Sequence, residues 1–531
     1  MFLNRRRVLT GLGAGLLFTY RLRQLSAAAP HNLDKKPTFD VSPFQLGVAS
    51  GDPATDGFVI WTRLAPRPME EAGGMTHLKP VMVDWDISED PKFSTVLRTG
   101  QTIAHPELAH SVHVEVEGLQ PDRPYWYRFR IAGHESAIGR GRTLPLPGAE
   151  VQRLRFVAAG CQHYEFGYYS AWRAIANENV DFIFHYGDYI YEGADIGAGV
   201  HTVYGKPFTA VRRHFGPEIY SLDEYRRRYA QYKMDPDLQA AHAAAPWLVS
   251  FDDHEVDNNW AGDTDQDGTP PDLFRLRRAA AMQAYYENMP LRASSLPDGS
   301  HMQIYRSFRF GDLMNTFVLD TRQYRSDQVY GDKDAPQGAD VWSPERTMMG
   351  TQQEEWLFNG LSKSDTRWNL LAHQVMVMDL AHRKSAHSEL LYSMDQWSGY
   401  MYSRNRLLQF IGDHCPGNVV NVTGDAHRHY AGNLVIDPDK QKPVSVEFLA
   451  TSISSGGDGA GDNDAHSQSV RRENPHLKAT TDKRGYVICD VGRDVWRADL
   501  KTLDQVSNHD GQLSTYASFA VERGRPGLEK A

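Results

Sequence analysis

Five short polar segments that could bind metal ions or transfer protons each directly follow an apolar run of the chain. They are Gly160-Cys161-Gln162, Gly187-Asp188-Tyr189-Ile190-Tyr191, Asp252-Asp253-His254-Glu255, His373 and Gly424-Asp425-Ala426-His427. Ligands of open α/β folds bind beyond the carboxyl ends of the strands, so we expect these side chains on one rim. Carboxylate, thiolate, phenol and imidazole groups on one rim are what a two-metal site needs, and soft ligands mixed with hard ones allow two different metals.

The elements that must position these groups alternate between strand and helix from about residue 152 onward. Apolar runs predict strands at 154–159, 181–186, 247–251, 316–319, 369–372 and 419–422, and helices are predicted at 170–177, 273–287, 351–361 and 403–412. Residues 40–145 differ, because short alternating runs such as 58–61 and 112–116 are separated by turn signals. This pattern predicts a small all-β domain, joined to the rest by a linker at 144–148.

The first 29 residues predict a signal peptide. Arg5-Arg6-Arg7 precede an apolar stretch at 8–20, and Ala27-Ala28-Ala29 offer a cleavage site. The paired arginines indicate twin-arginine export, although Asn4 and Val8 stand where Ser or Thr and Phe are usual. An ordinary secretory signal and a membrane anchor are the alternatives, and the shortness of the apolar run disfavours the anchor. We expect a periplasmic or secreted protein that engages the twin-arginine translocation machinery and has no stable membrane span once mature.

Length and composition limit the remaining choices. The 531 residues suit two or three domains, and 41% hydrophobic with 23% charged residues is ordinary globular composition. A net charge of -10 without a basic block lacks the footprint of a nucleic-acid-binding protein. Cys161, Cys415 and Cys489 are an odd number without CxxC spacing, which argues against a disulfide framework and a zinc knuckle.

The order of the strand-end motifs resembles that of the calcineurin-like metallophosphoesterases, and the Gly-Asp-x-x-Tyr variant resembles purple acid phosphatases. The strings Gly-Asp-Tyr-Ile-Tyr-Glu, Asp-Asp-His-Glu-Val, Asp-Thr-Arg-Gln-Tyr-Arg (320–325) and Thr-Gly-Asp are similar to those of PhoD-type alkaline phosphatases and phosphodiesterases. The resemblance covers essentially the whole chain. It implies a fold of α+β / α/β class, in which a fibronectin-like β-sandwich over 40–145 precedes an αββα metallophosphoesterase sandwich over 152–531.

The resemblance also implies a set of metal ligands. Fe3+ would be held by Cys161, Asp188, Tyr191 and His427, and Asp188 would bridge to a second metal surrounded by Asp253, His373 and Asp425. Asp253 and Asp425 replace the Asn and His that are usual in the superfamily, and such added carboxylates favour Ca2+ over zinc. Asn258, four residues after His254, becomes a further candidate ligand if a helix begins there.

The expected reaction is hydrolysis of phosphate mono- and diesters with an alkaline optimum. The metals would lower the pKa of a bridging water, whose hydroxide attacks phosphorus in line, and His254 would protonate the leaving alkoxide. One alternative is a lipid phosphodiesterase of phospholipase D type. Another, from a different class, is a non-catalytic cell-envelope protein that binds wall polymer.

Each motif also has a structural explanation when it is taken alone. Cys161 could be an inert core thiol and His373 a satisfied core histidine, but the coincidence of all the strand-end motifs outweighs these. For residues 320–325, a solvated charge cluster or a structural ion pair remains open. Asp263 to Gly268 match half of an EF-hand loop, and Phe274 in place of the final Glu favours an acidic surface loop.

Overall fold

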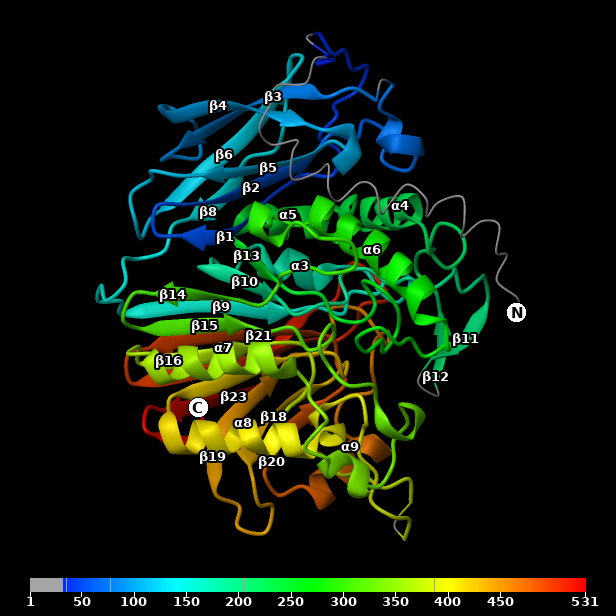
Figure 1. The fold of residues 1–531 in the computed structure, drawn as a ribbon, viewed down its shortest axis with the longest axis vertical. Helices are drawn as coiled ribbons and strands as arrows, with labels where there is room; N and C mark the ends of the chain where they lie inside the picture. The colour runs from blue at the N-terminus through cyan, green and yellow to red at the C-terminus, as the bar shows by residue number, and fades with distance from the viewer. Residues whose placement is uncertain (1–31, 35, 77, 204–205, 386) are drawn as a thin grey trace.

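The computed structural model describes residues 32–34, 36–76, 78–203, 206–385 and 387–531, so the predicted signal peptide at 1–29 lies outside the described residues. Two sheets pack face to face at the centre of the molecule, and helices cover both outer faces (Figure 1). This four-layer arrangement, with a β domain at one end, confirms the predicted fold class.

The first sheet has ten strands in the order β24-β23-β22-β21-β9-β10-β13-β1-β2-β5. Its central strands β9, β10 and β13 run parallel. Outside the β domain, its strands are β9 (Arg153–Ala159), β10 (Phe182–His185), β13 (Trp247–Val249), β21 (Gly485–Gly492), β22 (Val495–Leu503), β23 (Leu513–Glu522) and β24 (Arg525–Lys530).

The second sheet has seven strands in the order β14-β15-β16-β17-β19-β18-β20. Strands β15, β16, β17 and β19 pair in parallel. The bounds are β14 (Arg306–Phe310), β15 (Met314–Val318), β16 (Trp368–Ala372), β17 (Val419–Thr423), β18 (His429–Val435), β19 (Pro443–Leu449) and β20 (Leu477–Thr481).

Alternation along the strands explains the layering. In β10, Phe182 and Phe184 face the second sheet, whereas Ile183 faces the helices. A strand that is buried on both faces becomes a continuous apolar run, which is why the sequence marks these strands clearly. The first sheet is covered by α3 (Ser170–Ile175), α4 (Leu222–Lys233), α5 (Pro236–Ala244) and α6 (Pro271–Asn288), and the second by α7 (Gly350–Lys363) and α8 (Met401–His414), with α9 (Ala465–Glu473) near its edge.

The β domain consists of two packed layers that share an apolar core. One layer is a five-stranded sheet of β3 (Val81–Ser88), β4 (Val96–Ala104), β6 (Pro124–Ile131), β7 (His134–Glu135) and β8 (Gly139–Arg142). The other contains β1 (Val48–Ala54), β2 (Gly57–Arg63) and β5 (Ser111–Val116). Because Gly51 of β1 pairs in parallel with Trp247 of β13, this second layer continues the ten-stranded sheet. The boundaries 40–145 and 152–531 remain a prediction.

All the predicted strands and helices are present, with boundary shifts of a few residues. The strand predicted to end at Phe251 ends at Val249, and the helix predicted to reach Asn177 ends at Ile175. A separate hairpin, β11 (Val200–Val203) and β12 (Lys206–Thr209), projects at the right of Figure 1. Short 3-10 helices are η1 (Glu71–Gly74), η2 (Pro106–Leu108), η3 (Ala293–Ser295), η4 (Val329–Gly331), η5 (Ala339–Trp342) and η6 (Trp397–Gly399).

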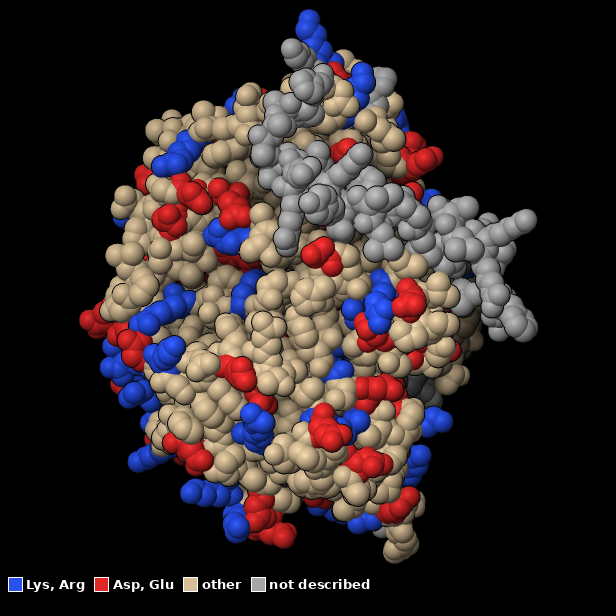
Figure 2. Space-filling model, viewed as in Figure 1, with Lys and Arg blue, Asp and Glu red and all other residues tan. Residues whose placement is uncertain are grey.

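The surface carries both signs of charge. On the face shown in Figure 2, Lys and Arg side chains are interspersed with Asp and Glu side chains. Cys161, Cys415 and Cys489 are all buried and free. None of the helices among the described residues combines the length and the apolarity that crossing a membrane requires.

Candidate metal centre

The carboxyl ends of five parallel strands bring the predicted polar groups to one rim. Cys161 follows β9, Asp188 follows β10, Asp253 follows β13, His373 follows β16 and Asp425 follows β17. The first three strands belong to one sheet and the last two to the other. The rim therefore lies where the carboxyl edges of the two stacked sheets meet.

Four of the predicted ligands have a left-handed backbone, which non-glycine residues rarely adopt. The φ angles are 52° at Cys161, 54° at Asp188, 65° at Asp425 and 53° at His427. This conformation costs an L-residue roughly 1–2 kcal/mol. Such strain is concentrated at functional sites, where the surrounding structure enforces it.

The glycines that precede two of these residues are required by close contacts. A Cβ atom on Gly187 would lie 2.3 Å from the Cβ of Asp252, and one on Gly424 would lie 2.2 Å from the Tyr186 ring. Both glycines therefore allow the Gly-Asp turns to approach their neighbours more closely than any side chain would permit.

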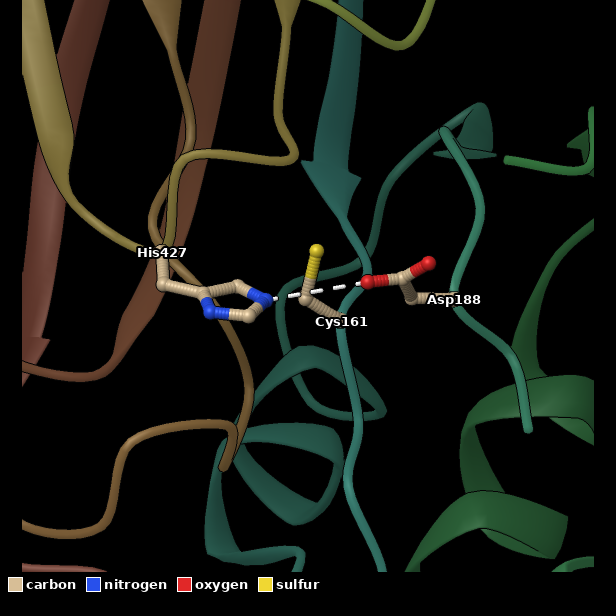
Figure 3. Close-up of side chains that lie close together, drawn as sticks. All are labelled: Cys161, Asp188 and His427. Atoms are coloured by element: carbon tan, nitrogen blue, oxygen red, sulfur yellow. Dashed lines mark ion pairs between the residues drawn. The ribbon is translucent and has the colours of Figure 1, made fainter. Parts of the chain in front are cut away.

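We call Cys161, Asp188, Tyr191 and His427 the mixed-donor group. The ligand atoms of Cys161, Asp188 and His427 lie within 4.8 Å of one another, and Figure 3 shows the imidazole and the carboxylate pointing toward each other beside the thiol. The Tyr191 hydroxyl donates to Asp188 Oδ2 at 2.7 Å and lies 3.1 Å from His427 Nε2. These separations suit neighbouring donors on one ion with bonds of about 2.0–2.3 Å.

We call Asp252, Asp253 and Asp425 the carboxylate group, whose ligand atoms also lie within 4.8 Å of one another. Asp188 and Asp253 form a further close set with His254. Asp188 therefore contacts both groups, and this is the position expected of a residue that bridges two cations.

The electrostatics of the rim fit bound cations. Asp188 Oδ1 and Asp252 Oδ2 are buried and accept no hydrogen bond from any described residue. Burial and the neighbouring carboxylates raise the pKa of Asp188 and Asp425 well above the usual range, and that of Asp252 to about 6. Carboxylates crowded in this way are stabilised in their ionised form by a cation, so the residues present fit metal binding.

A buried arginine partly neutralises the carboxylate group. Arg322 is fully buried, its Nη1 lies 3.0 Å from Asp395 Oδ1 and its Nη2 lies 3.2 Å from Asp425 Oδ1. Its Nε donates to Asp252. Residues 320–325 therefore form a structural ion-pair network, and the alternative of a solvated charge cluster was wrong. Sequence reasoning did not connect Arg322 with the metal ligands, because no local pattern joins it to them.

Two carboxylates that sequence reasoning did not assign position the other groups. His254 Nδ1 lies 2.7 Å from Glu192 Oε2. Burial alone would lower the pKa of His254, but the negative charges of Glu192 and Asp253 outweigh this effect and raise the pKa well above its usual value. Glu192 thereby fixes the ring and leaves Nε2 available as a proton donor. Glu255, the last residue of the Asp-Asp-His-Glu motif, accepts the N–H groups of Asp188 at 3.1 Å and Asp252 at 2.8 Å.

His373 and Asn258 are not gathered into these close groups. His373 is fully buried, burial lowers its pKa to about 3, and neither ring nitrogen is hydrogen-bonded within the part of the chain that the structure describes. The residues around Asn258 form turns instead of a helix, and its side chain donates to Gln266 Oε1 at 2.7 Å. The condition on which Asn258 was chosen is thus not met, and ligation by either residue stays a prediction.

Two other polar clusters lie beside arginines, which disfavour a bound cation. The predicted acidic loop is neutralised by arginines, since Asp263 lies 2.9 Å from Arg275 and 3.1 Å from Arg278. His163, Glu165 and His214 also lie close together, but Arg228 Nη1 stands 3.3 Å from His214 Nδ1 and would repel a cation.

Comparisons with known proteins decide the identity of this rim. The model of the PhoD-like phosphatase family matches residues 156–500, and that of the PhoD-like phosphatase N-terminal domain matches residues 27–145. The chain belongs to the PhoD-like phosphatase family. Alkaline phosphatase D of Bacillus subtilis (strain 168) is 45% identical over 532 residues, which cover 99% of this chain and 89% of that protein.

Solved structures agree with this membership. A structure of PhoD superposes with a TM-score of 0.89 at 46% identity and covers 93% of each chain. The purple acid phosphatase PPD1 of yellow lupin (Lupinus luteus) shares the fold, with a TM-score of 0.54 at 13% identity over 90% of this chain and 74% of its own. This PhoD-like protein is therefore a metal-dependent phosphoric ester hydrolase. Neither the phospholipase D-type alternative nor the polymer-binding alternative is favoured.

Proposed function

We propose that this PhoD-like protein is an alkaline phosphatase and phosphodiesterase that contains Fe3+ and Ca2+. The observation that carries the two-metal proposal is the position of Asp188, which contacts both the mixed-donor group and the set formed with Asp253 and His254. The name of the Bacillus relative supports the alkaline phosphatase activity.

The donor chemistry supports a different metal on each side. A phenol normally ionises near pH 10, and burial with nearby acids raises the pKa of the Cys161 thiol well above its usual value. Both groups therefore bind as anions only beside a strongly charged cation, which favours Fe3+ among the mixed donors. The carboxylate group offers oxygen ligands alone, and these favour Ca2+ over zinc.

The protein side chains have separate tasks in the proposed reaction. The bound metals supply Lewis-acid activation of water and neutralise charge on the phosphoryl group. His254 donates a proton to the departing alkoxide, and Glu192 holds its ring through the 2.7 Å contact. Arg322 keeps Asp252 and Asp425 in place, and its complete burial excludes contact with substrate.

The function is tested by metal exchange on the purified protein. A calcium-selective chelator should abolish hydrolysis of 4-nitrophenyl phosphate, and added calcium should restore it. Restoration by zinc, with calcium inert, would contradict the calcium assignment.

The role of His254 is tested by comparing leaving groups. His254→Ala should lower turnover of an alkyl phosphate by about two to four orders of magnitude, and that of the nitrophenyl ester by much less. His414→Ala, which alters an exposed histidine at the end of α8, is the matched control and should leave both rates unchanged. Equal losses on both esters would remove His254 from the donor role.

We also propose export by the twin-arginine route, on the strength of Arg5, Arg6 and Arg7. Replacing the three arginines with lysines should leave an unprocessed precursor inside the cell. Normal processing of that variant would assign the protein to the general secretory route instead.

A further inference from the structure

His163 lies beside the mixed-donor group but has no role in the reaction described so far. It stands two residues after Cys161, and its main-chain N–H donates to Ser455 Oγ at 3.1 Å. The same Oγ lies 2.6 Å from the Tyr191 hydroxyl oxygen. A single hydroxyl group therefore connects the His163 backbone to the phenol oxygen of a predicted metal ligand.

The ring of His163 also belongs to a row of three site rings. Its centroid lies 4.4 Å from that of Tyr191, whose centroid lies 4.1 Å from that of His254. On another side, Phe166 stacks on the His163 ring at 3.8 Å and 10°. The imidazole is thus held by packing at the same rim as the predicted proton donor, with Tyr191 between them.

The hydrogen bonds of His163 determine which ring nitrogen carries the proton. Nδ1 accepts the main-chain N–H of Glu165 at 3.3 Å, so the hydrogen of the neutral ring resides on Nε2. Nε2 forms no hydrogen bond with any described residue. Unlike the buried polar atoms that lack a partner, it is accessible at the surface. It is therefore a donor that reaches solvent, although the residue as a whole is only 9% exposed.

We propose that the Nε2–H of His163 donates a hydrogen bond to a non-bridging oxygen of the phosphoryl group. This inference rests on the proposed phosphoesterase function and adds a substrate-contacting residue to it. Negative charge is spread over these oxygens during phosphoryl transfer, and a donor fixed in advance stabilises that charge without reorganising. No bond to His163 forms or breaks, and the proton stays on Nε2.

Packing alone does not explain this arrangement. A phenylalanine would fill the same space against Phe166, whereas the imidazole adds at Nε2 an N–H donor that binds no described residue and reaches solvent beside Tyr191. Metal binding through Nδ1 is also excluded while that atom accepts the Glu165 N–H.

The test compares two replacements of His163 in the metal-loaded enzyme. His163→Phe keeps a ring on Phe166 but removes the donor, whereas His163→Gln places an amide N–H at a similar reach. We expect kcat/KM for 4-nitrophenyl phosphate to fall by about 10- to 100-fold in His163→Phe, the loss typical of a hydrogen bond to a charged group. Inhibition by orthovanadate should weaken similarly, and the metal content should not change. His163→Gln should recover most of both losses.

Three outcomes would overturn the inference. Wild-type kcat/KM in His163→Phe would show that the donor is not used. Equal impairment of His163→Gln and His163→Phe, reproduced by Phe166→Leu, would show that His163 acts only through packing. If the wild type itself hydrolyses no phosphate ester, the proposed function fails together with the inference, and this result is distinct from the other two.

Discussion

The mixed-donor group and the carboxylate group differ in how each is held together before a metal is considered. In the first, the potential ligands bond directly to one another, as the 2.7 Å contact between Tyr191 and Asp188 shows. In the second, carboxylates that would repel one another are held by Arg322, which is itself fully buried.

This difference predicts different metal retention on the two sides. Phenol and thiol groups become strong ligands only after they lose their protons to solvent, which a highly charged ion promotes by stabilising the phenolate and the thiolate. The resulting bonds are difficult to exchange. On the other side, Arg322 already supplies one positive charge, which lowers the attraction for an added cation. We therefore expect a tightly held ion among the mixed donors and an exchangeable ion at the carboxylates.

The largest effect should come from the residue that the two sides share. Asp188→Asn removes a negatively charged ligand that both proposed ions share. Because metal catalysis contributes several kcal/mol, turnover of 4-nitrophenyl phosphate should fall by about three orders of magnitude or more. Elemental analysis should show loss at both sites. Asp263→Asn, in the arginine-paired surface loop, is the control and should retain activity. If Asp188→Asn lost only one ion, the bridging role would be wrong.

A smaller effect, on stability instead of chemistry, should follow from replacing the arginine of the carboxylate group. Arg322→Met leaves buried carboxylates uncompensated, which should lower the free energy of unfolding by about 3–5 kcal/mol. Calcium should restore part of the lost free energy, because without the positive charge of Arg322 the carboxylates of the folded state bind a cation more favourably. Denaturant unfolding with and without calcium measures both effects.

Arg404→Met is the matched control for Arg322. Arg404 is equally enclosed, but it donates to main-chain carbonyls of Val377 and Val435 outside the carboxylate group. Its replacement should also destabilise the protein, without recovery on adding calcium. The same calcium response in both variants would show that Arg322 is not specific to the metal centre.

The sequence predicted those parts of the molecule that leave a local pattern. Strands buried on both faces are continuous apolar runs, so the strand ends that carry Cys161 and Asp188 could be located from the sequence. The pairing of Gly51 with Trp247 and the contact of Arg322 with Asp425 depend on residues far apart in the chain, and neither leaves such a pattern. The left-handed backbone at Asp425 was equally hidden, because aspartate has no strict preference for it.

Replacing Tyr191 should have the smallest effect on turnover. It is also the most direct test of how the two sides differ. A phenolate bound to Fe3+ absorbs visible light by charge transfer from ligand to metal, whereas calcium and zinc give no colour. The purified protein should therefore be coloured, and dithionite should bleach it by reducing the iron. Tyr191→Phe should remove the phenolate absorption even with iron bound, leaving only the weaker contribution of the Cys161 thiolate, because Cys161, Asp188 and His427 remain close enough to hold the ion. Calcium removal should stop turnover but leave the colour, since the exchangeable ion lies at the carboxylate group and not among the mixed donors. A visible spectrum recorded before and after chelation, with iron measured on the same sample, separates these effects. A colourless, fully active enzyme without iron would refute the ferric assignment and leave the rim as a site for two other ions.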